Sequence, residues 1–186
     1  VLFRSSTNRS KYRILSNDEI FKIKQKIKRK QNFDVIDKKI IGKLDFIKEC
    51  RDKIPKRIVS KQQLIHNDLI PSNTVFKSNK LVSIIDIDSL QIGNLYEDIV
   101  QCSFRFIIKN TRNINDIKKK IRIFLKNYTY RDYKNLDLQQ YKILLFKLIL
   151  EKISFIIRER YFMKSNLWIK DISKYLKFLD ICNMIA

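Results

Sequence analysis

Glycine and proline are almost missing from this chain, since each occurs only twice in 186 residues. An all-β fold needs such residues at regular intervals to form its tight turns. Apolar residues still make up 45% of the chain, which is enough for a packed core, and the length corresponds to one domain. We therefore expect a single, mainly helical domain over residues 1–186, with long helices joined by short polar loops.

The formal net charge of +21 raises the question of nucleic-acid binding, because clustered Lys and Arg release counterions from a phosphate backbone. Here the basic residues are spread along the whole chain. The densest run, residues 22–30, places Ile23 and Ile27 on one helical face, as an ordinary solvated helix does. Nucleic-acid binding is therefore an alternative, and we do not expect a nucleic-acid partner.

Cysteine spacing and hydropathy bear on the compartment. Cys50, Cys102 and Cys182 are far apart and form no CxxC pair, so neither a zinc site nor a disulfide framework is predicted. Charged residues interrupt the most apolar run, residues 141–157. Its uninterrupted apolar stretches are therefore much shorter than the roughly 20 residues needed to span a bilayer. We expect a reducing, cytoplasmic location and no membrane partner.

Apolar periodicity predicts most of the helices. Two amphipathic helices are expected before Pro55, at residues 18–28 and 33–54. The helical period returns after Gly93, and further helices are expected at residues 96–108, 114–128, 141–160 and 169–181. Four aromatic side chains near the last two helices follow the same period, so core packing is expected for Phe155, Tyr161, Phe162 and Trp168, with a substrate platform as the alternative.

Between these helical regions lies a segment with β character. A short apolar run at residues 64–65 leads into a polar loop, and two β-rich runs follow at 74–77 and 81–87. Ser78 and Asn79 separate the two runs, which is typical of a hairpin turn. The sequence thus predicts a mainly α chain with a small β-hairpin (α+β), organised as a helical lead-in, a loop with its hairpin, and a helical subdomain at residues 1–63, 64–88 and 89–186.

This β segment carries a group of side chains suited to one chemistry. His66, Asp68 and Asn73 form an HxDxxxxN motif, and the second β run ends in SIIDID, with Asp86 and Asp88. Phosphoryl transfer from a magnesium nucleotide needs one carboxylate to accept a proton and two further oxygen donors to hold the metal. Each residue alone could be a helix cap or a turn residue. Their combination with the hairpin favours the catalytic interpretation.

Residues 64–105 resemble the catalytic loop and metal-binding strand of the aminoglycoside phosphotransferases, choline kinases and related sugar kinases. By that resemblance Asp68 is the catalytic base, Asn73 and Asp86 are magnesium ligands, and His66 is a structural member of the loop. The resemblance also implies ATP or another nucleoside triphosphate and Mg²⁺ as cofactors, and the C-terminal lobe of a protein-kinase-like fold.

Two further acidic residues belong to the predicted site. The family often opens the next helix with an aromatic residue and an acid, and Tyr96 with Asp98 is similar to that element, which implies a supporting role for Asp98. For Asp88 three roles stay open: a metal ligand, a partner of one, or a solvated carboxylate. The short sequences HND and IDID, followed by Arg105 in a helix, especially resemble the corresponding motifs of the N-acetylhexosamine kinase branch.

A complete kinase of this type also has a preceding nucleotide lobe with a phosphate-covering loop and a Lys. The 63 residues before Leu64 are predicted to be helical, and the start, VLFRSS, has no initiator Met. We therefore expect the nucleotide lobe to be missing or to lie outside this sequence, so that the isolated chain is weak or inactive.

The expected function is an ATP- and Mg²⁺-dependent phosphotransferase that acts on a hydroxyl of a small molecule: a sugar, an amino alcohol or an aminoglycoside. Acidic residues are scattered in the later helices, which favours a neutral or anionic substrate over a polycationic one. The alternatives are a non-catalytic kinase-like binding or scaffold module, and a basic helical protein that binds nucleic acid.

Overall fold

The structure is a computed structural model that describes residues 13–55, 62–111, 113–128 and 137–185. Two compact units make up the chain. Unit 1 combines Val1–Lys56 with Phe146–Ala186, and unit 2 is Arg57–Leu145. Helices predominate, as expected, and small antiparallel sheets complete an α+β chain. The expectation of one domain over residues 1–186 stays a prediction.

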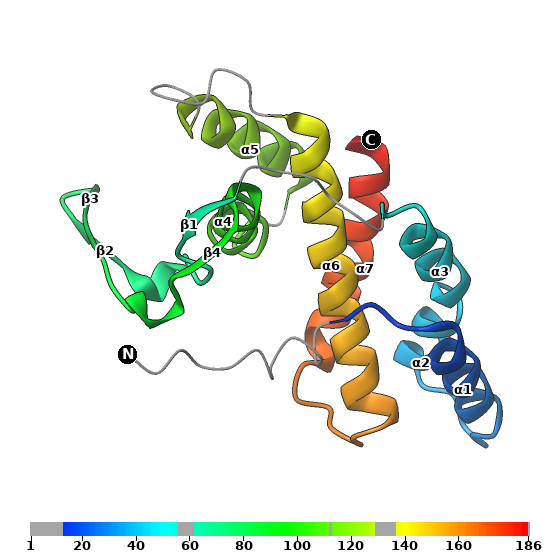
Figure 1. The fold of residues 1–186 in the computed structure, drawn as a ribbon. Helices are drawn as coiled ribbons and strands as arrows, with labels where there is room; N and C mark the ends of the chain where they lie inside the picture. Colours follow the sequence, from blue (N-terminus) through cyan, green and yellow to red (C-terminus); the bar gives the residue numbers. More distant parts are fainter. Residues whose placement is uncertain (1–12, 56–61, 112, 129–136, 186) are drawn as a thin grey trace. The chain divides into compact units, whose positions relative to one another are not determined.

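Unit 1 is a set of helices (Figure 1). Three of them come early in the chain: α1 (Asn17–Lys28), α2 (Val35–Ile41) and α3 (Leu44–Asp52). They share the unit with α7 (Ile169–Ile185) and with most of α6 (Leu138–Tyr161). Apolar side chains at three- and four-residue spacing form the core, among them Ile20, Ile23, Ile27, Ile149, Leu150, Ile153 and Ile157.

The prediction of one helix over residues 33–54 was wrong, because the chain breaks between α2 and α3. Gly42 caps α2 by donating its N–H to Lys38, and Lys43 then donates to Ile40. Glycine is the weakest ordinary helix former, so a break here costs little. Both halves still bury their apolar residues, with Ile40 and Leu44 fully covered.

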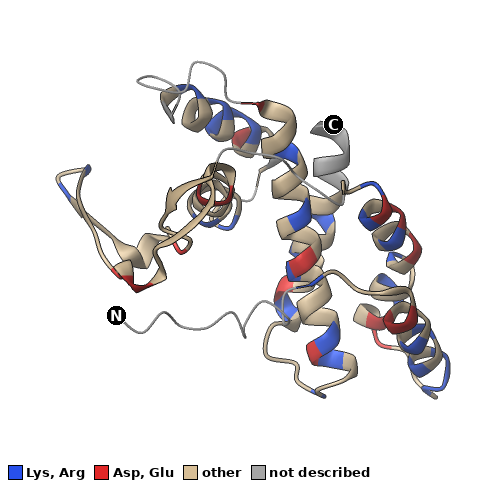
Figure 2. Cartoon of the chain, in the orientation of Figure 1, with Lys and Arg blue, Asp and Glu red and all other residues tan. Residues whose placement is uncertain are grey.

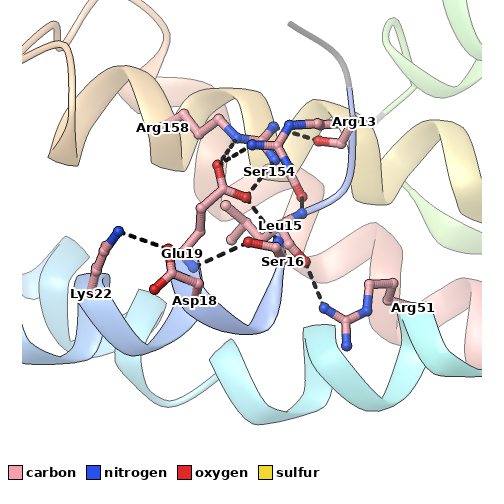
Figure 3. Close-up of polar contacts among 9 residues, drawn as sticks. All are labelled: Arg13, Leu15, Ser16, Asp18, Glu19, Lys22, Arg51, Ser154 and Arg158. Carbon is pink, nitrogen blue, oxygen red and sulfur yellow. Dashed lines mark hydrogen bonds and ion pairs between the residues drawn. The ribbon is translucent and has the colours of Figure 1, made fainter. Parts of the chain in front are cut away.

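The start of α1 is fixed by polar contacts (Figure 3). Ser16 and Glu19 form a reciprocal capping box at its first turn. The Glu19 carboxylate also pairs with Arg158 of α6, with 2.7 Å between Oε1 and Nε. Just before the helix, the backbone N–H of Leu15 donates to the hydroxyl of Ser154 at 3.1 Å. These bonds hold α1 against α6.

Unit 2 contains two small antiparallel sheets. β1 (Gln62–Ile65) pairs with β4 (Gln91–Asn94), and β2 (Thr74–Lys77) pairs with β3 (Lys80–Ile84). The predicted hairpin is thus present, and Ser78 and Asn79 both have positive φ, as its tight turn requires. The predicted second strand ends three residues early, at Ile84. β4 was not predicted, because its four residues have no alternating pattern and their partner is distant in sequence.

The helices of unit 2 follow the sheets. α4 (Leu95–Ser103) continues into a π-helical turn, η4 (Phe104–Ile108), and α5 (Ile114–Tyr128) comes next. The hydroxyls of Ser103 and Tyr141 meet at 2.8 Å and join α4 to the first turns of α6. The expected helix over 96–108 is therefore two elements, and the one over 114–128 coincides with α5.

Lys and Arg are distributed over the helices of both units and are interspersed with Asp and Glu (Figure 2). Among the described helices, none is both long and apolar enough to cross a membrane.

Candidate active site

The loop after β1 is held by a carboxylate from α4. The backbone N–H groups of His66 and Asn67 donate to the two oxygens of Asp98, at 2.6 and 2.7 Å. Asn67 has φ of 63°, a left-handed conformation that Asn tolerates better than most residues. Charge-assisted bonds to backbone amides are among the stronger hydrogen bonds. Asp98 therefore fixes the loop that leads directly to Asp68.

The imidazole of His66 connects this loop to the segment before Asp86. The ring is buried, and its Nε2 lies 3.1 Å from the carbonyl oxygen of Ile85. A carbonyl only accepts, so Nε2 is the donor in this bond. Nδ1 is buried and has no hydrogen-bond partner among the described residues. This geometry suits a residue that orders the loop.

Asn73 lies between the two predicted carboxylates. Its side chain is buried, and Nδ2 donates to the backbone oxygen and to Oδ2 of Asp68 at 3.0 and 3.1 Å. The same Nδ2 is 3.4 Å from Oδ2 of Asp86, a long hydrogen bond. The backbone supports this contact, because Ile85 donates its N–H to the carbonyl of Asn73 at 2.9 Å. The structure thus brings Asp68, Asn73 and Asp86 together.

Asp86 has a left-handed backbone, with φ of 62° and ψ of 52°. It lies two residues beyond β3, so it does not close the strand as the sequence predicted. Left-handed non-glycine residues cost roughly 1–2 kcal/mol and persist where the surroundings enforce them. Here the Ile85–Asn73 backbone bond and the following turn, η3 (Ile87–Ser89), determine where the Asp86 side chain points.

Asp88, the other acid of the motif, lies apart from these contacts. It is the middle residue of η3 and is exposed. Within the described ranges, no hydrogen bond or ion pair joins it to Asp68, Asn73 or Asp86. The three roles that the sequence left open for Asp88 therefore all stay open.

The donor set has the chemistry of a magnesium site. No three His, Cys, Asp or Glu side chains gather as a metal cluster in the described part of the chain. Asn73 and Asp86 nevertheless offer a carboxamide and a carboxylate oxygen, the hard ligands that Mg²⁺ takes along with several waters. Asp86 is exposed, which leaves room for those waters. To present Oδ1 toward the carboxylate, the Asn73 amide must rotate half a turn about χ2.

Sequence reasoning missed two residues that position the site. Asn94 caps α4 by accepting the N–H of Tyr96 at 2.9 Å, which places Asp98 in the first helical turn. An Asn followed within four residues by two acids, Glu97 and Asp98, is an N-cap signal that could have identified it. Gly93 faces Ile65 of the neighbouring strand so closely that an added Cβ would lie 2.4 Å from its Cδ1. No local pattern reveals that requirement.

The model of the phosphotransferase enzyme family (APH) matches residues 19–124, more than half of the chain. The matched range includes every predicted site residue from His66 to Asp98. A search of the curated proteins and a search of the solved structures each found no match. From the family match, together with the motif that it covers, this chain belongs to the phosphotransferase enzyme family.

Proposed function

We propose that this chain is the catalytic, C-terminal lobe of a kinase-like phosphotransferase that moves the γ-phosphoryl group of ATP, or of another nucleoside triphosphate, to a hydroxyl of a small molecule. The observation that carries the proposal is the position of Asn73, whose Nδ2 lies 3.1 Å from Asp68 and 3.4 Å from Asp86. Family membership supports the reaction class.

In this proposal Asp68 is the catalytic base. It accepts the proton of the acceptor hydroxyl while that oxygen forms its bond to the phosphorus atom. Asn73 donates to Oδ2 of Asp68, which orients the carboxylate and leaves Oδ1 for the hydroxyl. Asp98 and His66 keep the loop in place through their bonds to the backbone at Asn67 and Ile85.

After its amide rotates to turn Oδ1 toward Asp86, Asn73 would give up its bond to Asp68 and would hold Mg²⁺ together with Asp86. The charge of the ion would neutralise the triphosphate oxygens. Since phosphoryl transfer depends mainly on positioning and electrostatics, the convergence of Asp68, Asn73 and Asp86 matters more than any single group.

The nucleotide itself needs a further binding element. Residues 13–55 form helices and contribute no strand, so they do not supply a strand-loop-strand for the phosphates. The β2–β3 hairpin exposes a group of large apolar side chains: Val75, Phe76, Leu81, Val82 and Ile84. We propose that a nucleotide lobe packs against this surface, since exposed apolar patches of this kind mark interaction sites.

For the acceptor, the proposal favours a sugar or an amino alcohol, with the N-acetylhexosamine kinase branch as the first group to test. The described acids of the later helices are few and scattered, among them Glu151, Glu159 and Asp171. A polycationic aminoglycoside needs an acidic pocket, so it is the less favoured member of the same substrate class.

Thermal unfolding with nucleotide tests the proposal. ATP together with Mg²⁺ should raise the melting temperature more than either does alone, because binding to the folded state stabilises it. Asp86→Asn should remove the magnesium-dependent part of this shift. Equal responses of wild type and variant would rule out Asp86 as a metal ligand, and no response in either would favour the non-catalytic binding module.

A transfer assay with a panel of sugars and amino alcohols tests the chemistry. We expect weak turnover that Asp68→Asn lowers by roughly 10²- to 10⁴-fold, the usual contribution of general base catalysis. Turnover that survives Asp68→Asn would rule out this residue as the base. Robust turnover that depends on Asp68 would instead show that the isolated chain needs no separate nucleotide lobe.

A further inference from the structure

Two turns of unit 1 are tied together by Arg160, near the end of α6. The first turn, residues 29–34, joins α1 to α2, which begins at Val35, and the second, residues 162–168, joins α6 to α7 (Figure 1). The guanidinium of Arg160 donates to Oδ1 of Asn166 in the second turn at 3.0 Å, and it pairs with Asp34 in the first. The two turns therefore lie at the same end of the unit.

A buried carboxylate makes this connection rigid. Asp37 of α2 is only 1% exposed, and it accepts bonds from Lys30, Arg160 and the hydroxyl of Tyr161 at 2.6, 3.0 and 2.5 Å. A buried charge is tolerated only when its partners satisfy it in this way. The donors come from the first turn and from the end of α6, so the network fixes both turns in one arrangement.

These rigid turns and the first residue of α2 present large apolar side chains to solvent. Their exposed fractions run from 43% to 71%, and they are Phe33, Val35, Met163, Leu167 and Trp168, here called the apolar tips. The expectation that Trp168 packs in the core was wrong, whereas Tyr161 is buried as expected. Scattered single apolar residues on a surface are ordinary, but five on, or directly after, two turns that are joined to each other form a patch.

Basic side chains lie on the same two turns and on the helix ends that adjoin them. The exposed ones are Lys26, Lys28, Arg29, Lys164 and Lys170, here called the basic collar. One member of the basic collar, Lys26, lies beside the second turn, because the Nζ atom of Lys26 is 4.5 Å from the ring centre of Phe162. Residues 26–35 and 162–170 contain one exposed acidic residue, Asp34, and its carboxylate forms an ion pair with Arg160. Figure 2 shows the basic residues at this end of α1 and α6.

We propose that this end of unit 1 binds an anionic lipid surface, with the apolar tips inserted at the headgroup boundary and the basic collar against the lipid phosphates. Trp, Phe and Leu beside Lys and Arg are the composition of interfacial membrane contacts. The net charge of +21 adds long-range attraction to an anionic leaflet. This departs from the sequence-based expectation of no membrane partner, which considered only a spanning segment.

Trp168 provides a direct test, because it is the only Trp in the chain. Its fluorescence is followed while the protein is mixed with vesicles of phosphatidylcholine and phosphatidylserine, or of phosphatidylcholine alone. We expect a blue shift with the anionic vesicles, quenching by brominated lipid, and weakening by salt. An unchanged emission, or equal shifts with both vesicles, overturns the proposal.

Paired variants separate local binding from overall charge. Lys164→Gln with Lys170→Gln should weaken vesicle binding roughly fivefold per cation. The matched control, Lys119→Gln with Arg122→Gln on the exposed face of α5, removes the same charge from unit 2 and should change binding much less. Equal losses in the two pairs would show adsorption by net charge alone and would overturn the proposal.

A second pair tests insertion of the tips. Met163→Ser with Leu167→Ser should abolish the Trp168 blue shift, whereas Val82→Ser with Ile92→Ser, two exposed positions of unit 2, should leave it intact. All four are exposed, so circular dichroism should show an unchanged fold. A blue shift that persists in the Met163 and Leu167 variant contradicts insertion.

Discussion

The carboxylate of Asp98 accepts the backbone N–H of His66 at 2.6 Å, although 32 residues separate the two in sequence. Its other oxygen accepts the N–H of Asn67. One side chain in the first turn of α4 thus determines the path of the loop that carries Asp68. Because both acceptors belong to a single carboxylate, the loop is sensitive to the smallest change at this position.

Asp98→Asn should destabilise the loop. An amide offers one acceptor oxygen, and its NH₂ group would face the second backbone donor, so one backbone N–H loses its partner. We expect the free energy of unfolding in urea to fall by about 1.5–3 kcal/mol, the usual contribution of a hydrogen bond to a charged group. The control, Asp116→Asn in the exposed first turn of α5, should change it by less than about 0.5 kcal/mol. Similar losses in both variants would argue against the role of the Asp98 carboxylate in holding the loop.

The two glycines of the chain should respond oppositely to alanine. At Gly93 a new Cβ would lie 2.4 Å from Cδ1 of the buried Ile65, so Gly93→Ala should cost about 1–3 kcal/mol by overpacking. At Gly42 the nearest atom is 3.4 Å away and φ is −67°, so Gly42→Ala should be neutral or stabilising by up to about 1 kcal/mol. Urea unfolding of both variants checks the contrast, and a loss at Gly42 equal to that at Gly93 would contradict it.

Asp86 combines a left-handed backbone with a proposed metal-binding role, and two variants separate these properties. Asn adopts φ near 62° with little strain, so Asp86→Asn should keep the stability of the free protein while it removes stabilisation by ATP with Mg²⁺. Asp86→Val should lose about 1–2 kcal/mol even without nucleotide, because a β-branched residue resists this conformation. Melting temperatures with and without ATP and Mg²⁺ measure both effects. Equal stability of the two variants without nucleotide would remove the argument from backbone strain.

Acid should destabilise unit 1 through two carboxylates. Burial raises the pKa of Asp37, but hydrogen bonds from Lys30 and Tyr161 outweigh this effect and lower the pKa to about 2. Burial also raises the pKa of Glu19, and there hydrogen bonds from Arg158 outweigh it and lower the pKa to about 2. In the unfolded chain both pKa values are roughly 4. The stabilisation is therefore present above about pH 4 and is lost as the pH falls toward about 2.

The measurement is the melting temperature as a function of pH. Asp37→Asn and Glu19→Gln should each make the acid-induced decrease less steep, since the variant can no longer take up that proton on unfolding. The control is Asp45→Asn, in an exposed ion pair with Lys24, which should leave the steepness unchanged. A profile that is equally steep in all the variants would show that other groups cause the acid sensitivity.

Apolar periodicity was enough to predict most helices, and it failed where neighbouring elements decide the outcome. The expected helix over 114–128 coincides with α5, since its apolar residues repeat without interruption. The expected helix over 33–54 breaks at Gly42, and the one over 96–108 changes to a π-helical turn at Phe104. The apolar repeat shows which face of a helix is buried. It does not show whether the helix must be interrupted so that both halves can pack against other helices.

The sequence by itself predicted a phosphotransferase, because the HxDxxxxN motif and the following Asp86 put two carboxylates and a carboxamide on a loop and a hairpin of suitable length. Tertiary structure decided that Asn73 turns its amide to both carboxylates, that Asp98 holds the loop, and that β4 lies beside β1. It also decided that Trp168 faces solvent. The physical reason is that residue type and spacing are local properties, whereas burial and the choice of a hydrogen-bond partner depend on segments that are distant in the chain.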